Sequence, residues 1–168
     1  VQGAAGAAAR RALGELREQI DAAADAVREV AHGLSPRILS EQGLGPALEE
    51  LTAGLPVETD VSWEGRTGSG APSPSDEASE DLYLIASEAI TNAMKHSGCS
   101  RIEVDVARQD DVVQLTVRDD GAGGAAPTGR GILSMAARAR RLGGTFELVS
   151  PDGGPTTVMV RIPSGGPR

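Results

Sequence analysis

Three polar residues recur along one predicted helix at a spacing that points to a functional ridge. Glu88, Asn92 and Lys95 lie at i, i+4 and i+7, positions that stack on one side of an α-helix. The opposite side of the segment 85–94 is apolar, as in a helix that buries one face. Lys95 is the only lysine among the 16 basic residues, the others being arginine. The simplest alternative is a solvated lysine, but it leaves the carboxylate and the amide beside it unexplained.

A glycine-rich segment, residues 119–131, lies between a predicted strand and a predicted helix. Backbone N–H groups and a helix N-terminus at such a junction can bind phosphate. Asp119 ends the strand, where a carboxylate can accept a hydrogen bond from an amino group such as adenine N6, and glycines there let a flat ring approach the backbone. The segment matches neither the Walker A pattern nor GxGxxG. A glycine-rich surface loop would explain the glycines, but not their coincidence with the Glu88–Asn92–Lys95 ridge.

The composition restricts the classes of function. The 168 residues suffice for one domain, or one domain with an appendage, and their net charge of −8 argues against nucleic acid while permitting a small polyanion. Cys99 is the only cysteine, which suits a reducing compartment. No apolar run approaches the roughly 18 residues of a membrane span, so we expect no membrane contact by this fragment.

Hydrophobic periodicity predicts the order of the elements. A heptad seam over residues 4–34 indicates a long helix that packs against another helix, and a shorter helix is expected at 44–53. Alternating strands are expected at 57–63, 101–107, 112–118, 144–150 and 156–162. Helices starting near Ser79 or Glu80 and near Ile132 separate them, and Arg138, Arg140 and Arg141 form a solvated face of the second. The pattern predicts an α+β two-layer sandwich.

Four motifs together resemble a known fold. "EAITNAMKH" (88–96) resembles the N box of the GHKL (Bergerat-type) ATP-binding fold, "DDGAG" (119–123) and "GRG" (129–131) its glycine boxes, and "GGPTTVMVRIP" (153–163) its last strands. The segment "GRGILSMAARARRLGG" further resembles sensor histidine kinases of the NarL-partnered class. Residues 27–51 are similar to the end of their HisKA_3-type dimerisation and phosphoacceptor hairpin. The resemblance implies that residues 1–53 are the C-terminal part of that hairpin and 54–168 the GHKL catalytic domain.

The resemblance implies roles for the residues of the N box. Asn92 would ligate a Mg²⁺ ion that bridges the ATP phosphates. Glu88 would orient a water ligand of that ion or help to polarise the nucleophile. Lys95 and His96 would lie toward the phosphates, although a helix-end role for His96 stays open.

It also implies how the nucleotide is held. Asp119 would bind the adenine amino group, with Gly121 and Gly123 making room for the base. Gly129 and Gly131 would hinge a lid and donate backbone N–H groups, with Arg130 as a phosphate contact. Thr156 or Thr157 would lie beneath the adenine, hydrogen-bonded to the Asp119 network. The lid is short and Pro155 replaces the usual glycine, so this chain departs from the family pattern at both places.

The function implied is that of the ATP-binding catalytic region of a two-component sensor histidine kinase. It would transfer the γ-phosphate of ATP to a histidine and thence to a response regulator of the NarL type, acting as a homodimer through the hairpin. Neither His32 nor His96 fits the acceptor, which we expect upstream of Val1. We expect a cytoplasmic location, whether or not the full-length parent is membrane-anchored. A GHKL serine kinase of the anti-sigma-factor type and a non-catalytic nucleotide-binding dimer scaffold are the alternatives.

Overall fold

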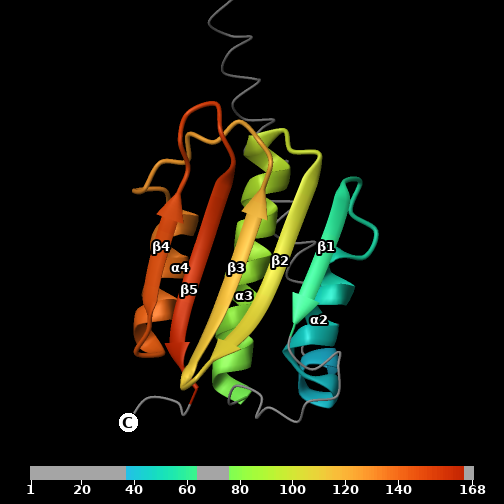
Figure 1. Ribbon diagram of the computed structural model, residues 1–168, viewed down its shortest axis with the longest axis vertical. Coiled ribbons are helices and arrows are strands. Elements are labelled where there is room, and N and C mark those ends of the chain that lie inside the picture. Colours follow the sequence, from blue (N-terminus) through green and yellow to red (C-terminus); the bar gives the residue numbers. More distant parts are fainter. Residues whose placement is uncertain (1–36, 64–75, 165–168) are drawn as a thin grey trace, which may run out of the picture. The chain divides into compact units, whose positions relative to one another are not determined.

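A five-stranded mixed sheet forms one layer of the domain and helices form the other (Figure 1). The computed structural model describes residues 37–63 and 76–164. The compact unit that contains the sheet runs from Ile38 to Arg168. The predicted helix over residues 4–34 lies outside the described residues. Within the described residues no helix is long and apolar enough to cross a membrane.

The strands are β1 (Glu58–Trp63), β2 (Arg101–Gln109), β3 (Val112–Asp119), β4 (Thr145–Val149) and β5 (Thr156–Pro163). Their order in the sheet is β1-β2-β3-β5-β4. Only the β1–β2 pair is parallel among these strands. The strands that follow each other directly in the chain, β2–β3 and β4–β5, form antiparallel pairs, and β3 joins the two pairs by bonding to β5.

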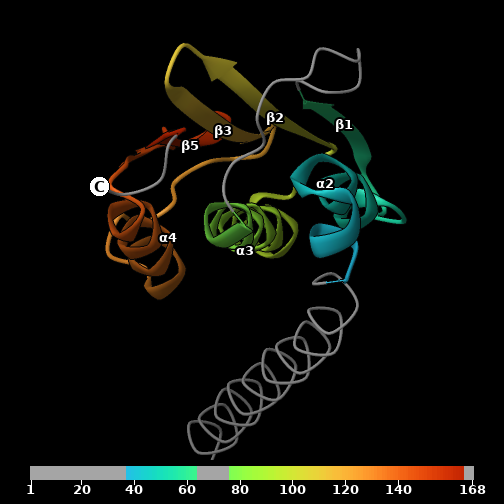
Figure 2. The same cartoon turned by 90° about the horizontal axis from the view of Figure 1, so that it is seen from below.

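Three helices cover one face of this sheet: α2 (Leu44–Thr52), α3 (Asp76–Asn92) and α4 (Arg130–Arg141). The end-on view in Figure 2 shows α3 between the other two, all on the same side of the strands. The parallel β1–β2 pair requires a crossover, which α3 supplies because it lies between these strands in the chain. The predicted α+β two-layer sandwich is confirmed.

Alternating residues of the strands form the core beneath the helices. Val104, Val117 and Val158 are register partners on neighbouring strands and all three are buried. The apolar stripe of α3 packs against such rows, and Ile85 and Ile90 are buried as the pattern predicted. Burial of aliphatic side chains on both layers therefore fixes which face of α3 points away from the sheet.

The helix α2 belongs to the same core. Leu44, Ala47 and Leu48 are buried in the cluster that also contains the sheet residues. The compact unit that contains α2 and the sheet begins at Ile38. The assignment of residues 1–53 to a dimerisation hairpin stays a prediction.

The α-helical geometry of α3 stops at Asn92, and residues Ala93–Ser97 form a π-helical turn, η1. The Ser97 hydroxyl donates to the carbonyl of Ala93 at 2.8 Å, and Gly98 follows in the left-handed region with φ 63°. A wider turn rotates the following side chains, so the predicted continuation of the ridge to Lys95 with α-helical spacing is wrong. Single π turns are frequent at functional sites.

A buried acid joins α3 to the end of α4. The carboxylate of Asp81 is 1% exposed and accepts hydrogen bonds from Arg138 Nη1 at 2.9 Å and from Arg141 Nε at 3.0 Å. The predicted solvated face of α4 is confirmed for Arg140 and Arg141, which are exposed, whereas Arg138 is half-buried and both Arg138 and Arg141 also pair with Asp81. Periodicity missed the pair because Asp81 is a polar residue at a buried position, 57 residues away from Arg138 in the chain.

Candidate functional site

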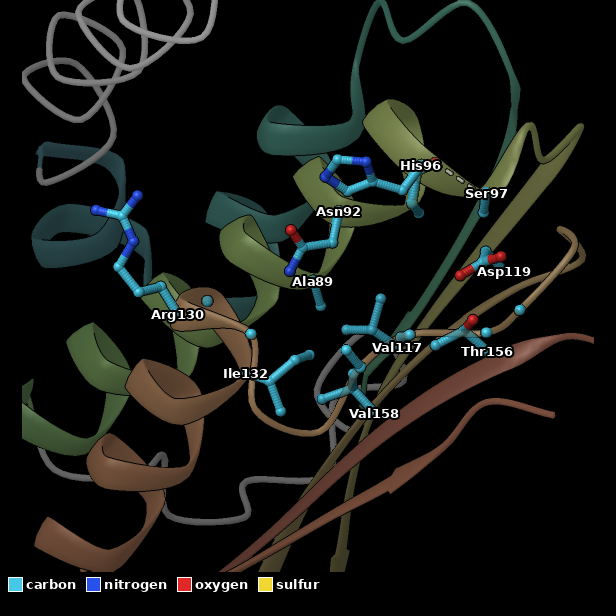
Figure 3. Close-up of a pocket in the computed structure, with 17 residues that line it drawn as sticks. Ala89, Asn92, His96, Ser97, Val117, Asp119, Arg130, Ile132, Thr156 and Val158 are labelled. Atoms are coloured by element: carbon cyan, nitrogen blue, oxygen red, sulfur yellow. Dashed lines mark hydrogen bonds between the residues drawn. The ribbon is translucent and has the colours of Figure 1, made fainter. Parts of the chain in front are cut away.

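A cavity of about 460 Å³ lies between the C-terminal half of α3, the N-terminus of α4 and strands β3 and β5 (Figure 3). Its volume falls within the range of small-molecule sites. The residues that line it are Ala89, Asn92, Ala93, His96, Ser97, Val117, Asp119, Gly123, Gly124, Ala125, Ala126, Gly129, Arg130, Gly131, Ile132, Thr156 and Val158. Sequence elements that are far apart in the chain thus converge on one site.

The α3 wall carries polar groups on an apolar support. Ala89 is buried against the core, one turn before the half-buried Asn92, whose amide points into the cavity in Figure 3. His96 follows on the π turn and is exposed at the rim. The buried stripe of α3 holds the Asn92 backbone against the sheet, which limits the movement of the amide.

The sheet wall presents a carboxylate and a hydroxyl side by side. Asp119 and Thr156 are register partners at the ends of β3 and β5, and both line the cavity. Asp119 is only 5% exposed, and its Oδ1 accepts the backbone N–H of Gly121 at 2.9 Å. A buried carboxylate with one oxygen held by the backbone leaves its other lone pairs for a donor in the cavity.

The first part of the glycine segment is pressed against its neighbours. A Cβ on Gly121 would lie 2.3 Å from the Cβ of Ser97, and the next N–H, that of Ala122, donates to the Ser97 carbonyl at 2.9 Å. Gly123 has φ 64°, and a Cβ there would lie 2.0 Å from the carbonyl oxygen of Pro151. Both positions therefore exclude a side chain, because the backbone packs too closely on each side.

The N-terminus of α4 meets the ridge of α3 through Gly131. A Cβ on this residue would lie 2.1 Å from Oε1 of Glu88 and 3.2 Å from Nδ2 of Asn92. Gly129 is the N-cap residue and makes no side-chain cap bond. The unpaired N–H groups of a first helical turn, with the positive end of the helix dipole, favour an anion there.

The structure brings most of the predicted site residues together and leaves some apart. Those that line the cavity are Asn92, His96, Asp119, Gly123, Gly129, Arg130, Gly131 and Thr156. Gly121 packs against Ser97, and Glu88 packs against Gly131, so each lies behind a residue that lines the cavity. Lys95 is exposed and is not among the lining residues.

The choice between the two threonines is settled by strand alternation. Thr157 pairs with Arg118, so it lies on the opposite face of the sheet from Thr156. The Thr156 hydroxyl lies 2.9 Å from the Ser150 hydroxyl. Thr156 is also the register partner of Asp119, and its place in an Asp119 network beneath the adenine stays a prediction.

Three residues near the cavity escaped the sequence analysis: Ser97, Asp120 and Ser150. Asp120 Oδ1 accepts the backbone N–H groups of Ser100 and Arg101, and Oδ2 accepts the Ser100 hydroxyl at 2.6 Å. These hydrogen bonds lower the pKa of Asp120 to about 2, and the one from the Ser100 hydroxyl has the largest effect. The aspartate doublet 119–120 was a usable signal, since strand alternation must send the two carboxylates to opposite faces.

The arrangement suits a flat polar ring with an anionic tail. A ring against Val117, Val158 and Ile132 would have the Asp119 carboxylate at its edge, and a tail would reach the first turn of α4 and Asn92. The apolar floor favours burial of the ring, whereas the helix N-terminus favours the anion.

Comparison with known proteins points in the same direction. Residues 77–166 match the profile of a family described as histidine kinase-, DNA gyrase B- and HSP90-like ATPase. The chain is 28% identical to the sensor histidine kinase MctS of Rhizobium johnstonii over 158 residues, covering 90% of this chain and 34% of that protein. It is 35% identical over 161 residues to the nitrate/nitrite sensor protein NarX of Escherichia coli, covering 90% of this chain and 26% of NarX. The chain thus spans about a third or less of these relatives.

Solved structures share the fold. The histidine kinase domain of the blue-light activated histidine kinase from Erythrobacter litoralis EL346 has a TM-score of 0.60 at 19% identity, covering 73% of this chain and 60% of that one. The histidine kinase AdeS of Acinetobacter baumannii has a TM-score of 0.57 at 14% identity, covering 90% and 83%. At these identities the likeness concerns the fold, and the predicted GHKL fold is confirmed.

Proposed function

The chain belongs to the histidine kinase-, DNA gyrase B- and HSP90-like ATPase family, and we propose that it is the ATP-binding catalytic region of a sensor histidine kinase. Members of this family share an ATP-binding domain, which here covers residues 77–166. The reaction proposed is transfer of the γ-phosphate of ATP to a histidine side chain. Such transfers depend mainly on positioning and on neutralisation of charge.

One observation carries the proposal: the carboxylate of Asp119 and the amide of Asn92 lie on opposite walls of a single cavity. Asp119 would accept a hydrogen bond from the adenine amino group, because it is buried and keeps free lone pairs. Gly123 lines the cavity and would let the backbone lie against the base, because the glycine packs closely on Pro151. The triphosphate would then run toward Asn92 and the first turn of α4.

The residues near Asn92 fit a magnesium ion. Glu88 Oε1 and Asn92 Nδ2 both lie close to the position that a Cβ of Gly131 would occupy. A carboxylate and a carboxamide, each with an oxygen that can bind a metal ion, therefore converge at the N-terminus of α4. Mg²⁺ in phosphoryl-transfer sites takes one or two protein oxygen ligands, with water and phosphate oxygens completing the shell. We assign Asn92 as the direct ligand and Glu88 as the residue that holds a water ligand. The ion would neutralise charge on the phosphates when bound.

The remaining basic side chains at the site are assigned to the phosphates. His96 and Arg130 line the cavity from η1 and from the first turn of α4. Both are exposed, so each could turn toward a phosphoryl group as the nucleotide enters. Lys95 lies on the π turn and does not line the cavity, so its proposed phosphate role needs a similar movement. Gly129 and Gly131 would allow the segment before α4 to close.

The relatives support a partner in signal transduction. NarX is a nitrate/nitrite sensor protein, and UhpB of Salmonella typhimurium, 30% identical over 159 residues, is a signal transduction histidine-protein kinase/phosphatase. We propose that this chain works with a response regulator of the NarL type and that the parent protein is a homodimer through a helical hairpin. The phosphoacceptor would be a histidine of a separate hairpin helix, because His96 lies at the cavity and His32 directly precedes Gly33, where the predicted N-terminal helix ends.

Titration calorimetry with ATP tests nucleotide and metal binding together. We expect the full chain to bind ATP more tightly with Mg²⁺ than with EDTA, and the Asn92→Ala variant to lose this difference. Asn92→Asp keeps an oxygen ligand, so this variant should keep part of the difference in ATP affinity between Mg²⁺ and EDTA. Thr91→Ala is the matched control, because Thr91 lies beside Asn92 on α3 and does not line the cavity. Full magnesium dependence in Asn92→Ala would contradict the assignment.

Phosphotransfer separates the proposed kinase from its alternatives. Labelled ATP and Mg²⁺ are incubated with the chain and a separately supplied hairpin that carries its histidine. We expect acid-labile phosphate on the hairpin and none on His32 of the chain itself. Acid-stable phosphate on a serine substrate would favour a serine kinase of the anti-sigma-factor type. Binding of ATP without any transfer would favour the nucleotide-binding scaffold.

A further inference from the structure

Ser150 joins the glycine segment to the sheet wall of the cavity. Its Oγ accepts the backbone N–H of Ala125 at 3.0 Å and lies 2.9 Å from Oγ1 of Thr156. The Ser150 carbonyl also accepts the N–H of Gly124 at 3.3 Å. Ser150 is half-buried and does not itself line the cavity, whereas Thr156, Gly124 and Ala125 do. One residue outside the site thus touches three residues inside it.

The hydrogen bonds around Ser150 allow an arrangement in which the Thr156 proton faces the cavity. A hydroxyl carries one proton and two acceptor positions, and Ala125 already fills one acceptor position of Ser150. Either hydroxyl can be the donor in the Ser150–Thr156 contact, and when Ser150 donates, the Thr156 proton is left for the cavity side. Thr156 is there the register partner of Asp119, whose carboxylate oxygens accept hydrogen bonds.

This polarity matches one edge of adenine. That edge presents an amino donor beside a ring nitrogen that accepts, so it needs one acceptor and one donor from the protein. Asp119 supplies the acceptor, and a Thr156 hydroxyl that points its proton into the cavity supplies the donor, directly or through a water. Figure 3 shows both side chains on the same wall.

We propose that Ser150 is a positioning residue for nucleotide binding, which acts by orienting the Thr156 hydroxyl and by fixing Ala125 at the cavity rim. The inference rests on the proposed function, because it assumes that the nucleotide base lies against Asp119 and Thr156. Ser150 needs no contact with the nucleotide, and its effect passes through Thr156.

A double-mutant cycle on ATP affinity tests the inference. We expect Ser150→Ala to weaken ATP binding about fivefold, the effect of one hydrogen bond. Thr156→Val, which keeps the shape and removes the hydroxyl, should weaken it at least as much. In the Thr156→Val background, Ser150→Ala should have little further effect, because the residue that it orients is gone. Ser150→Thr keeps the hydroxyl and should restore most of the affinity.

Each outcome decides a different point. If the unaltered chain does not bind ATP, the proposed function fails. If it binds ATP and Ser150→Ala binds equally well, only the role of Ser150 fails. A full fivefold loss from Ser150→Ala in the Thr156→Val background would also overturn the role, since it would then be independent of Thr156. Amide exchange at Ala125 supplies a second readout: it should accelerate in Ser150→Ala and stay slow in Thr156→Val.

Discussion

The Cβ that Gly131 lacks would lie 2.1 Å from Oε1 of Glu88. Gly131 is the second residue of α4, and Glu88 faces it from α3. Only a residue without a side chain lets the first turn of α4 come this close to the carboxylate. The contact places the N–H groups of α4 next to the polar ridge, where a phosphate and its metal ion are proposed to bind.

Replacement of this glycine should impair phosphotransfer far more than folding. In Gly131→Ala the new methyl group meets the flexible end of Glu88, so that side chain can move aside at little cost in stability. We expect a change of less than about 1 kcal/mol in unfolding free energy, because alanine also favours the helix. The displaced Glu88 can no longer hold its water ligand, so phosphotransfer to the supplied hairpin should fall about tenfold or more.

Urea unfolding and the transfer assay measure both effects, with Ser134→Ala as the control. Ser134 is exposed on the same helix and does not line the cavity. Equal phosphotransfer in Gly131→Ala and the unaltered chain would exclude the proposed role of the Glu88 contact.

Gly123 and Gly124 offer a matched pair for backbone packing. Both have positive φ, 64° and 74°, so alanine carries a similar conformational penalty at each. A Cβ on Gly123 also meets the backbone oxygens of Pro151 and Gly154, whereas on Gly124 the nearest atom is Asp152 Oδ1 at 3.1 Å. We expect Gly123→Ala to lose about 3 kcal/mol in urea unfolding and Gly124→Ala about 1. Similar losses in the two variants would show that the backbone contact relaxes.

Asp81 should contribute strongly to stability although it lies outside the cavity. Asp81→Ala removes a carboxylate that is 1% exposed and leaves Arg138 and Arg141 without this partner. We expect a loss of roughly 3 kcal/mol in urea unfolding, near the lower end for a broken buried pair because both arginines can reach water. Arg140→Ala on the same helix is the control and should change stability by less than about 0.5 kcal/mol. Comparable values for the two variants would refute the prediction.

Asp120 should make stability depend on pH in the acid range. Its pKa is about 2 in the folded chain against an ordinary value of 3.8, chiefly because the Ser100 hydroxyl and two backbone N–H groups donate to it. The stabilisation is complete above about pH 5, where both states are ionised, and it is lost as the pH falls toward 2 because the unfolded chain binds the proton first. In Asp120→Asn this part of the decline should disappear.

Melting temperatures measured between about pH 5 and pH 2 test this prediction. Asp111→Asn is the control, since Asp111 is also exposed and no side-chain hydrogen bond of it is recorded among the described residues. The slope of melting temperature against pH should be shallower only in Asp120→Asn. Parallel curves for the two variants would mean that the Asp120 hydrogen bonds do not contribute to acid stability.

Much of the domain followed from local pattern. Alternation found all five strands, and the apolar stripe of residues 85–94 identified the buried face of α3. The motifs around Asn92, Asp119 and Gly131 predicted the GHKL fold and the similarity to sensor histidine kinases, both confirmed by the comparisons. These features are predictable because they depend on a few residues that are close in the chain.

Other features depended on contacts that no local pattern encodes. The Asp81 pair and the hydrogen bond between Ser150 and Thr156 require α4 and the β4–β5 turn to be in place. The π turn that carries Lys95 lies where α3 ends against the glycine segment, with Ser97 packed against Gly121.

The sequence by itself determined the periods of burial, and therefore the elements, the two layers and which residue types stand near the site. The tertiary structure decided which of two adjacent residues faces the cavity, Thr156 rather than Thr157. It also decided which polar groups form hydrogen bonds with each other, such as Ser150 and Thr156. The physical reason is the separation along the chain over which each feature is determined. Burial follows a period along the chain, whereas hydrogen-bond partners are fixed only when distant segments meet at about 3 Å.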